Sequence, residues 1–143
     1  MKKNITLLIV SFFFTSLAYS QSDEVKQQLT TIAYLMAQEN YEITHDVVYT
    51  YLDESETDNF TLSLKKHYTY RIAAVCDGDC GDIDLKLYDE NGNDIATDED
   101  EDDNPIIEVS PKWTGEFELN VEMYDCDIQP CKVGIIVFGK YIY

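Results

Sequence analysis

The feature that most constrains the fold of this chain is a strict alternation of apolar and polar residues near its C-terminal end. Four apolar residues alternate with four polar ones, as Phe117, Leu119, Val121 and Met123 set against Glu116, Glu118, Asn120 and Glu122. A period of two places the two sets on opposite faces of a β-strand. This segment is therefore predicted to be a strand with one buried face and one wet face.

Similar segments recur from Tyr41 to the C-terminal part of the chain, separated by turn signals. The predicted strands cover residues 45–52, 60–64, 68–74, 83–87, 106–109, 117–123 and 133–138. Asn91-Gly92 and Thr114-Gly115 are turn dipeptides between them. The pattern predicts a mainly β domain over residues 41–143, an antiparallel β-sandwich or jelly roll of seven to eight strands.

A helical period precedes the strands, over residues 21–40. Ser22 can cap a helix whose first turn holds Asp23 and Glu24, since carboxylates favour the positive end of the helix dipole. The apolar stripe of this helix consists of Val25, Leu29, Ile32 and Met36. It either closes one face of its own domain or docks on a partner.

The first twenty residues resemble a secretory signal peptide. Lys2 and Lys3 precede a largely apolar run of 13 residues, 5–17, and Ala18-Tyr19-Ser20 follows as a cleavage site. The run is shorter than the roughly 20 residues of a membrane-spanning helix, so we expect it to be removed near Gln21. The protein is then secreted, to the periplasm, the cell surface or the medium. The first cysteine is Cys76, so no lipid anchor is expected.

The charge of the chain narrows the choice of partner. The net charge is −18, and without Lys2 and Lys3 there are 8 basic residues against 28 acidic ones. Nucleic acid and anionic membranes are disfavoured, because both are bound through lysine and arginine. The negative charge therefore suits binding of a divalent cation or of a basic protein, or it serves only to keep the protein soluble.

The four cysteines fall as Cys76-x-x-x-Cys80 and Cys126-x-x-x-x-Cys131. An even count in a secreted chain indicates disulfides, and three connectivities are open. Each pair lies between two predicted strands, where a reversal brings the two Cα atoms close enough to bridge. Pairing within each loop is the favoured arrangement.

Two acidic clusters are the candidate metal ligands. The first consists of Asp77, Asp79, Asp82 and Asp84 around the first cysteine loop, and the second is the unbroken run 98–103. Carboxylate oxygens suit Ca²⁺, and extracellular modules use weak calcium sites. A solvated surface loop is the alternative for the run, because adjacent carboxylates repel one another.

The strand region resembles the bacterial pre-peptidase C-terminal domain over roughly residues 44–138. The resemblance rests on Tyr70-Arg71-Ile72, on Asp82-Ile83-Asp84-Leu85-Lys86-Leu87-Tyr88-Asp89 with Asn91-Gly92, and on Gly115-Glu116-Phe117-Glu118-Leu119-Asn120-Val121. It implies a secreted, non-catalytic β-sandwich that assists secretion or binds substrate beside an extracellular hydrolase, with calcium bound in some relatives. In this chain a helix stands where the peptidase of that family would be.

No catalytic motif is recognisable. His45 and His67 are the only histidines, and neither belongs to a hydrolase or metalloprotease motif. Trp113, just before a turn, is the candidate exposed aromatic for binding a polysaccharide or an extracellular protein. The sequence predicts a non-enzymatic secreted binding or stability module with calcium as a candidate ion. The alternative is an interaction or inhibitor protein that docks a basic partner through its helix and acidic face.

Overall fold

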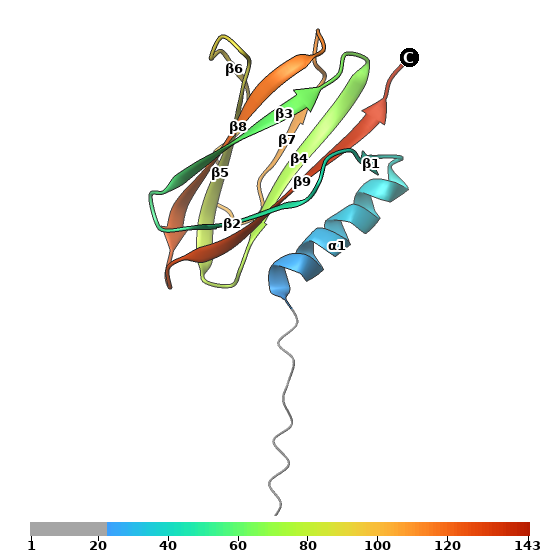
Figure 1. Cartoon of the computed structure of the whole chain (residues 1–143). Coiled ribbons are helices and arrows are strands. Elements are labelled where there is room, and N and C mark those ends of the chain that lie inside the picture. Colours follow the sequence, from blue (N-terminus) through green and yellow to red (C-terminus); the bar gives the residue numbers. More distant parts are fainter. Residues whose placement is uncertain (1–22) are drawn as a thin grey trace, which may run out of the picture.

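Two antiparallel sheets and one helix make up the part of the chain that the structure, a computed structural model, describes, which is residues 23–143 (Figure 1). The predicted signal peptide lies outside the described residues, as does Ser22. The elements are α1 (Glu24–Gln38), β1 (Glu42–Ile43), β2 (Val48–Leu52), β3 (Thr57–Leu64), β4 (Tyr68–Cys76), β5 (Cys80–Tyr88), β6 (Asp94–Asp98), β7 (Ile106–Val109), β8 (Gly115–Cys126) and β9 (Cys131–Tyr141).

The strands pair into two sheets that stack as a sandwich. In sheet A, β9 pairs with β1, β2 and β4, and β4 also pairs with β7. In sheet B the order is β3-β8-β5-β6. Every pairing is antiparallel, so the predicted mainly β fold is confirmed.

The alternation read from the sequence builds the core between the sheets. In β8 the four apolar residues at 117–123 are at most 2% exposed, while Glu116 and Glu118 face the solvent. The apolar residues of β4 and β5 that face them belong to the same cluster, which includes Ile72, Leu85 and Leu87. Burial of this shared apolar layer is the main favourable term in folding.

Helix α1 covers the outer face of sheet A. Val25 and Leu29 are 1% and 4% exposed and pack with Ile136 and Phe138 of β9. A Cβ atom at Gly134 would lie 2.7 Å from Val25 Cγ1 and 2.8 Å from Leu29 Cδ1, so the glycine permits the close approach of helix and strand. The helix is thus an integral layer of the domain.

The ends of α1 are held by polar contacts that differ partly from the prediction. The N-cap is Asp23, whose Oδ1 accepts a hydrogen bond from the backbone of Lys26 at 3.4 Å. At the other end, Arg71 of β4 donates to Glu39 at 2.6 Å and to Glu108 of β7 at 2.8 Å. The guanidinium of Arg71 therefore ties the helix terminus to sheet A.

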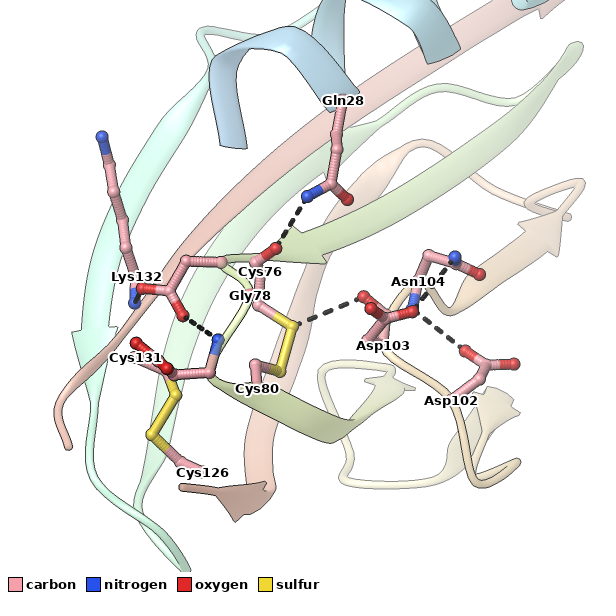
Figure 2. Close-up of a disulfide and its surroundings, with 12 residues drawn as sticks. Gln28, Cys76, Gly78, Cys80, Asp102, Asp103, Asn104, Cys126, Cys131 and Lys132 are labelled. Atoms are coloured by element: carbon pink, nitrogen blue, oxygen red, sulfur yellow. Dashed lines mark hydrogen bonds between the residues drawn. A yellow bond between two sulfur atoms is a disulfide. The ribbon is translucent and has the colours of Figure 1, made fainter. Parts of the chain in front are cut away.

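Both disulfides form within their own loops, as predicted. Cys76 is bonded to Cys80 and Cys126 to Cys131, with Cα atoms 5.9 and 6.1 Å apart. Figure 2 shows the two bridges close together at one end of the sandwich, with residues 102–104 beside the first. Cys80 and Cys126 are direct neighbours in the pairing of β5 with β8, which places both loops at the same end. Such bridges are typical of an oxidising, extracellular type of compartment.

The structure adds two strands that the sequence analysis missed. The first is β1, of only two residues, and the second is β6, whose last residue, Asp98, opens the acidic run. The predicted Asn91-Gly92 turn joins β5 to β6, with Gly92 at a φ of 77°. Helix α1, the helix of the described chain, is not long and apolar enough to cross a membrane.

Candidate functional site

The outer face of sheet B is rich in carboxylates. Among residues 23–143 the one helix, α1, lies on sheet A and leaves the outer face of sheet B uncovered (Figure 1). We call this surface the acidic face, and define it by the outward residues Asp82, Asp84, Glu99, Glu116, Glu118 and Glu122. It follows directly from the period-two pattern, which puts the wet half of β5 and β8 on one surface.

One basic residue lies within the four strands of sheet B. This residue is Lys86 of β5, and its Nζ pairs with Glu99 Oε1 at 2.6 Å. Its pKa is raised, first by that hydrogen bond. A single lysine leaves most of the charge of the acidic face unbalanced.

Asp84 is the most unusual group on this face. It is 8% exposed, and it lies directly opposite Glu122 in the pairing of β5 with β8. No hydrogen bond within residues 23–143 holds its carboxylate. Burial first, then the charges of Asp82, Glu99 and Glu122, raise its pKa to about 6, against a smaller opposing effect of Lys86. A desolvated carboxylate without a donor is costly as an anion, so this position favours either a proton or an added cation.

Asp82 lies two residues earlier on the same side of β5, and one of its carboxylate oxygens also lacks a hydrogen-bond donor within residues 23–143. Its Oδ1 is a buried atom with no hydrogen-bond partner in the described chain. Burial raises the pKa of Asp82, with further contributions from the charges of Glu101, Asp102 and Asp125 and a smaller opposing effect of the backbone of Asp102. A buried acceptor without a donor is uncommon in folded proteins, so the ionised form of Asp82 is disfavoured at this position.

A hollow opens beside Asp82, at the end of the acidic face near the disulfides. Its volume is about 480 Å³, and it is lined by Glu54, Gly81, Asp82, Glu101, Tyr124 and Asp125. Four of these six residues are acidic and one is a tyrosine that is 62% exposed. We call this hollow the acidic pocket.

The walls of the acidic pocket come from four separate parts of the chain, of which Glu101 represents the acidic run. Glu54 is on the β2–β3 turn, which is attached to β8 because Ser55 donates its backbone N–H to the carbonyl of Met123 at 2.7 Å. Asp82 is on β5, and Tyr124 and Asp125 are on β8. A Cβ atom at Gly81 would lie 2.5 Å from Asp125 Oδ2, so the glycine lets that carboxylate lie against β5.

A second hollow, of about 590 Å³, lies at the other end of the acidic face. Tyr88, Glu116 and Glu118 are among its lining residues. Asp89, which also lines it, is structural, because its carboxylate accepts hydrogen bonds from the backbones of Asn91 and Asn93 at 2.8 and 2.9 Å. From Glu118 to Tyr124 of β8 the two hollows are separated by roughly 20 Å of strand.

The four aspartates predicted as calcium ligands do not act as one group. Asp77 Oδ2 accepts a hydrogen bond from the backbone of Lys132 at 2.7 Å, and Asp77 Oδ1 accepts one from Asp79 at 3.4 Å. Asp82 and Asp84 belong instead to the acidic face. Across residues 23–143, no group of three or more histidine, cysteine or acidic side chains is arranged to hold a metal ion.

The acidic run 98–103 is attached to the sheets rather than free in solvent. Asp98 Oδ2 accepts a hydrogen bond from the backbone of Ile106 at 2.9 Å, and the carbonyl of Asp102 accepts one from Ile83 of β5 at 3.0 Å. Figure 2 shows Asp102 Oδ1 accepting from the backbone of Asn104, and the carbonyl of Asp103 near the sulfur of Cys76. The run therefore forms one wall of the acidic pocket through Glu101.

The predicted aromatic and helical binding surfaces differ in how far they are exposed. Trp113 is 36% exposed, as expected, and stacks on Phe117 with the ring centroids 5.6 Å apart. In the apolar stripe of α1, Val25 and Leu29 are buried, and Ile32 and Met36 pack against the same cluster. The stripe packs on its own domain, so the docking alternative loses its best anchor on the helix.

Comparison with known proteins gives no assignment. No protein-family model matches the chain, and no curated protein is significantly similar to it in sequence.

Proposed function

We propose that this protein is a non-catalytic binding module, and that its acidic face captures a basic segment of a partner protein. The observation that carries the proposal is Asp84, a carboxylate that is 8% exposed and has no hydrogen-bond partner in the described chain. A lysine or arginine of a partner would supply both the charge and the donors that the folded domain lacks.

The layout of the acidic face supports an extended ligand. Two hollows lie on one sheet face, roughly 20 Å apart along β8, which matches about six residues of an extended peptide. Glu116, Glu118 and Glu122 lie along the strand that joins them. Carboxylates of one sign over an open surface also speed the encounter with a basic partner.

The proposal excludes catalysis, although a carboxyl with a pKa of about 6 could in principle act as a general acid. Asp84 does not line the hollow beside it, and its neighbours across the strands, Glu122 and Glu99, are further carboxylates. Its raised pKa is accounted for by burial among like charges, so we assign it to ligand binding.

Secretion and the resemblance to the pre-peptidase C-terminal domain belong to the same proposal. Both disulfides suit an oxidising compartment outside the cytoplasm, and the signal-like residues 1–20 supply the route. A β-sandwich is the architecture that the resemblance implies. Calcium, which some relatives bind, is the competing ligand for the same carboxylates.

The test is binding of a fluorescent basic peptide to the purified domain, measured by polarisation at constant ionic strength. Changing Glu116→Gln together with Glu118→Gln should weaken binding about tenfold, at roughly 0.7 kcal/mol for each exposed charge. The matched control is Glu42→Gln with Asp46→Asn, which removes the same charge from exposed positions on and beside β1.

The control pair should change the affinity by less than about twofold. Equal weakening in the two variants would mean that only the net charge matters, and the acidic face would lose its role. A peptide that fails to bind at all would also refute the proposal.

A further inference from the structure

We propose that the four cysteines form one redox-sensitive switch, in which reduction by a dithiol moves a disulfide from the two loops to a bridge between Cys80 and Cys126. This inference goes beyond the proposed function and does not depend on the acidic face. It rests on the pairing of β5 with β8 and on the burial of the cysteines.

The first argument is the position of Cys80 and Cys126. They are direct Cα partners across β5 and β8, although each is bonded to another cysteine. The pair next to them is hydrogen-bonded, because Asp127 donates its backbone N–H to the carbonyl of Asp79 at 2.8 Å. Hydrogen-bonded and non-hydrogen-bonded pairs alternate along an antiparallel ladder, so Cys80 and Cys126 form a non-hydrogen-bonded pair. The Cα atoms of such a pair are roughly 4.5 Å apart, which a disulfide can span.

The second argument is the direction of the two side chains. Cys80 and Cys126 are 6% and 3% exposed, and both belong to the core cluster between the sheets. Figure 2 shows the two disulfides close together at this end of the sandwich. A thiolate freed at one of these residues therefore lies beside the disulfide of the other, which it can attack.

The outer cysteines, Cys76 and Cys131, are not paired in this way. The Cα partner of Cys76 is Val133, and that of Cys131 is Leu52. Cys131 is two residues from Val133 on β9, so it is a diagonal neighbour of Cys76. Diagonal neighbours are roughly 7–8 Å apart, which is beyond the usual span of a disulfide. Exchange can therefore join the two inner cysteines but not the two outer ones.

The exchange balances in two steps. A dithiol first reduces the Cys76–Cys80 bridge, so that the reductant becomes a disulfide and both cysteines become thiols. The thiolate of Cys80 then attacks Sγ of Cys126, the Cys126–Cys131 bond breaks, and Cys131 leaves as a thiolate that takes up the proton lost by Cys80. Reduction of the other bridge first leads to the same product, which has one disulfide and thiols at Cys76 and Cys131.

The exchange would change the junction between the sheets and α1. The carbonyl of Cys76 accepts a hydrogen bond from Gln28 Nε2 at 2.8 Å (Figure 2), and the backbone N–H of Gly78 donates to Glu24 Oε2 at 3.1 Å. Opening the Cys76–Cys80 bridge releases the loop that makes these contacts with the helix. At the same time β5 and β8 become covalently joined.

The experiment is partial reduction of the folded protein with one equivalent of dithiothreitol. Thiols are trapped with iodoacetamide, and the half-reduced species is mapped by mass spectrometry of its peptides without further reduction. We expect a Cys80–Cys126 bridge with Cys76 and Cys131 alkylated. A half-reduced species that contains only Cys76–Cys80 or only Cys126–Cys131 would overturn the proposal.

Single substitutions test the exchange without a reductant. Cys76→Ala and Cys131→Ala each leave an inner cysteine free, so at least about a tenth of the folded molecules should form the Cys80–Cys126 bridge at pH 8. Cys80→Ala and Cys126→Ala are the matched controls, because each leaves an outer cysteine free and should retain the other loop bridge. A Cys126–Cys131 bridge in every molecule of Cys76→Ala would contradict the proposal.

Denaturant shows whether the new bridge depends on the fold. In guanidinium chloride the strands no longer pair, and a short loop closes more readily than one of about 46 residues. Cys76→Ala should therefore return to the Cys126–Cys131 bridge when it is unfolded at pH 8. An equal yield of Cys80–Cys126 in the folded and unfolded variant would mean that the pairing of β5 with β8 does not direct the exchange, and the switch would be refuted.

Discussion

Asp84 of β5 lies directly opposite Glu122 of β8, so two carboxylates face each other across neighbouring strands of an open sheet. Like charges in this position destabilise a sheet, and one of the two is also 8% exposed. This repulsion destabilises the free protein, and a cation bound on the acidic face would reduce it. This relationship links the stability of the domain to its proposed ligand.

The first prediction concerns stability and pH. The pKa of Asp84 is raised to about 6, above its ordinary value of 3.8. Between about pH 4 and pH 6 the folded state therefore binds more protons than the unfolded state, so the contribution of Asp84 to stability falls as the pH rises and is flat above about pH 7. Asp84→Asn should raise the free energy of unfolding at pH 7.5 by about 1–3 kcal/mol.

Urea denaturation at pH 5 and pH 7.5 measures this effect. The gain from Asp84→Asn should shrink at the lower pH, and Asp94→Asn, at an exposed position of the same sheet, should show neither change. A variant that is destabilised at pH 7.5 would show that Asp84 has a stabilising partner within the domain.

Ligand binding should depend on pH in the opposite direction. A cation prefers the ionised carboxylates, so the affinity for the basic peptide should rise between pH 5 and pH 7, as Asp84 loses its proton. The groups that face Asp84 are Asp82, Lys86, Glu99 and Glu122. Polarisation titrations at pH 5, 6 and 7 in the same salt measure the trend, and a constant affinity would contradict it.

The helix should be required for stability. Leu29→Ala removes a side chain that is 4% exposed between α1 and β9, so the free energy of unfolding should fall by about 2–4 kcal/mol. Leu35→Ala is the matched control on the same helix, because Leu35 is 53% exposed and should change stability by less than about 0.5 kcal/mol. Similar losses in both variants would refute the packing of α1 on sheet A.

The two disulfides should differ in their effect on binding. Each closes a short loop, so replacing either cysteine pair by alanine should lower the free energy of unfolding by about 2 kcal/mol. Cys126 directly follows Asp125, so loss of the Cys126–Cys131 bridge should also weaken binding of the basic peptide. Loss of the Cys76–Cys80 bridge should affect peptide binding less, and the reverse order, measured by polarisation titration, would contradict the assignment.

Much of the fold could be predicted because the spacing of apolar residues along the sequence shows which side of each helix or strand is buried. The alternation at 116–123 marks a strand with one wet face, and the spacing of Val25 and Leu29 marks a helix with one apolar stripe. β6 was missed because Asp94 to Asp98 contains three apolar or small residues between acids and has no clean alternation. Its pairing with β5 is set by the local Asn91-Gly92 turn between the two strands.

The candidate site could be predicted only in part. The sequence predicts Asp82 and Asp84 as metal ligands together with Asp77 and Asp79, but the surroundings of the latter two differ because of the turn at the first disulfide. Tyr124 and Asp125 were not identified, because irregular register between β5 and β8 at Cys80–Ile83 decides what they face. Glu101 reaches the acidic pocket only because the acidic run is pinned to β5.

The most direct test of the account is to map where a basic peptide binds. Backbone amide shifts of the ¹⁵N-labelled domain should be followed during titration with an arginine-containing peptide at pH 7. We predict that the shifts follow the acidic face, on β5 and β8 from Glu118 to Asp125, and leave α1 and β2 unchanged. Shifts confined to α1, or to Tyr49 and Tyr51 of β2, would contradict the account.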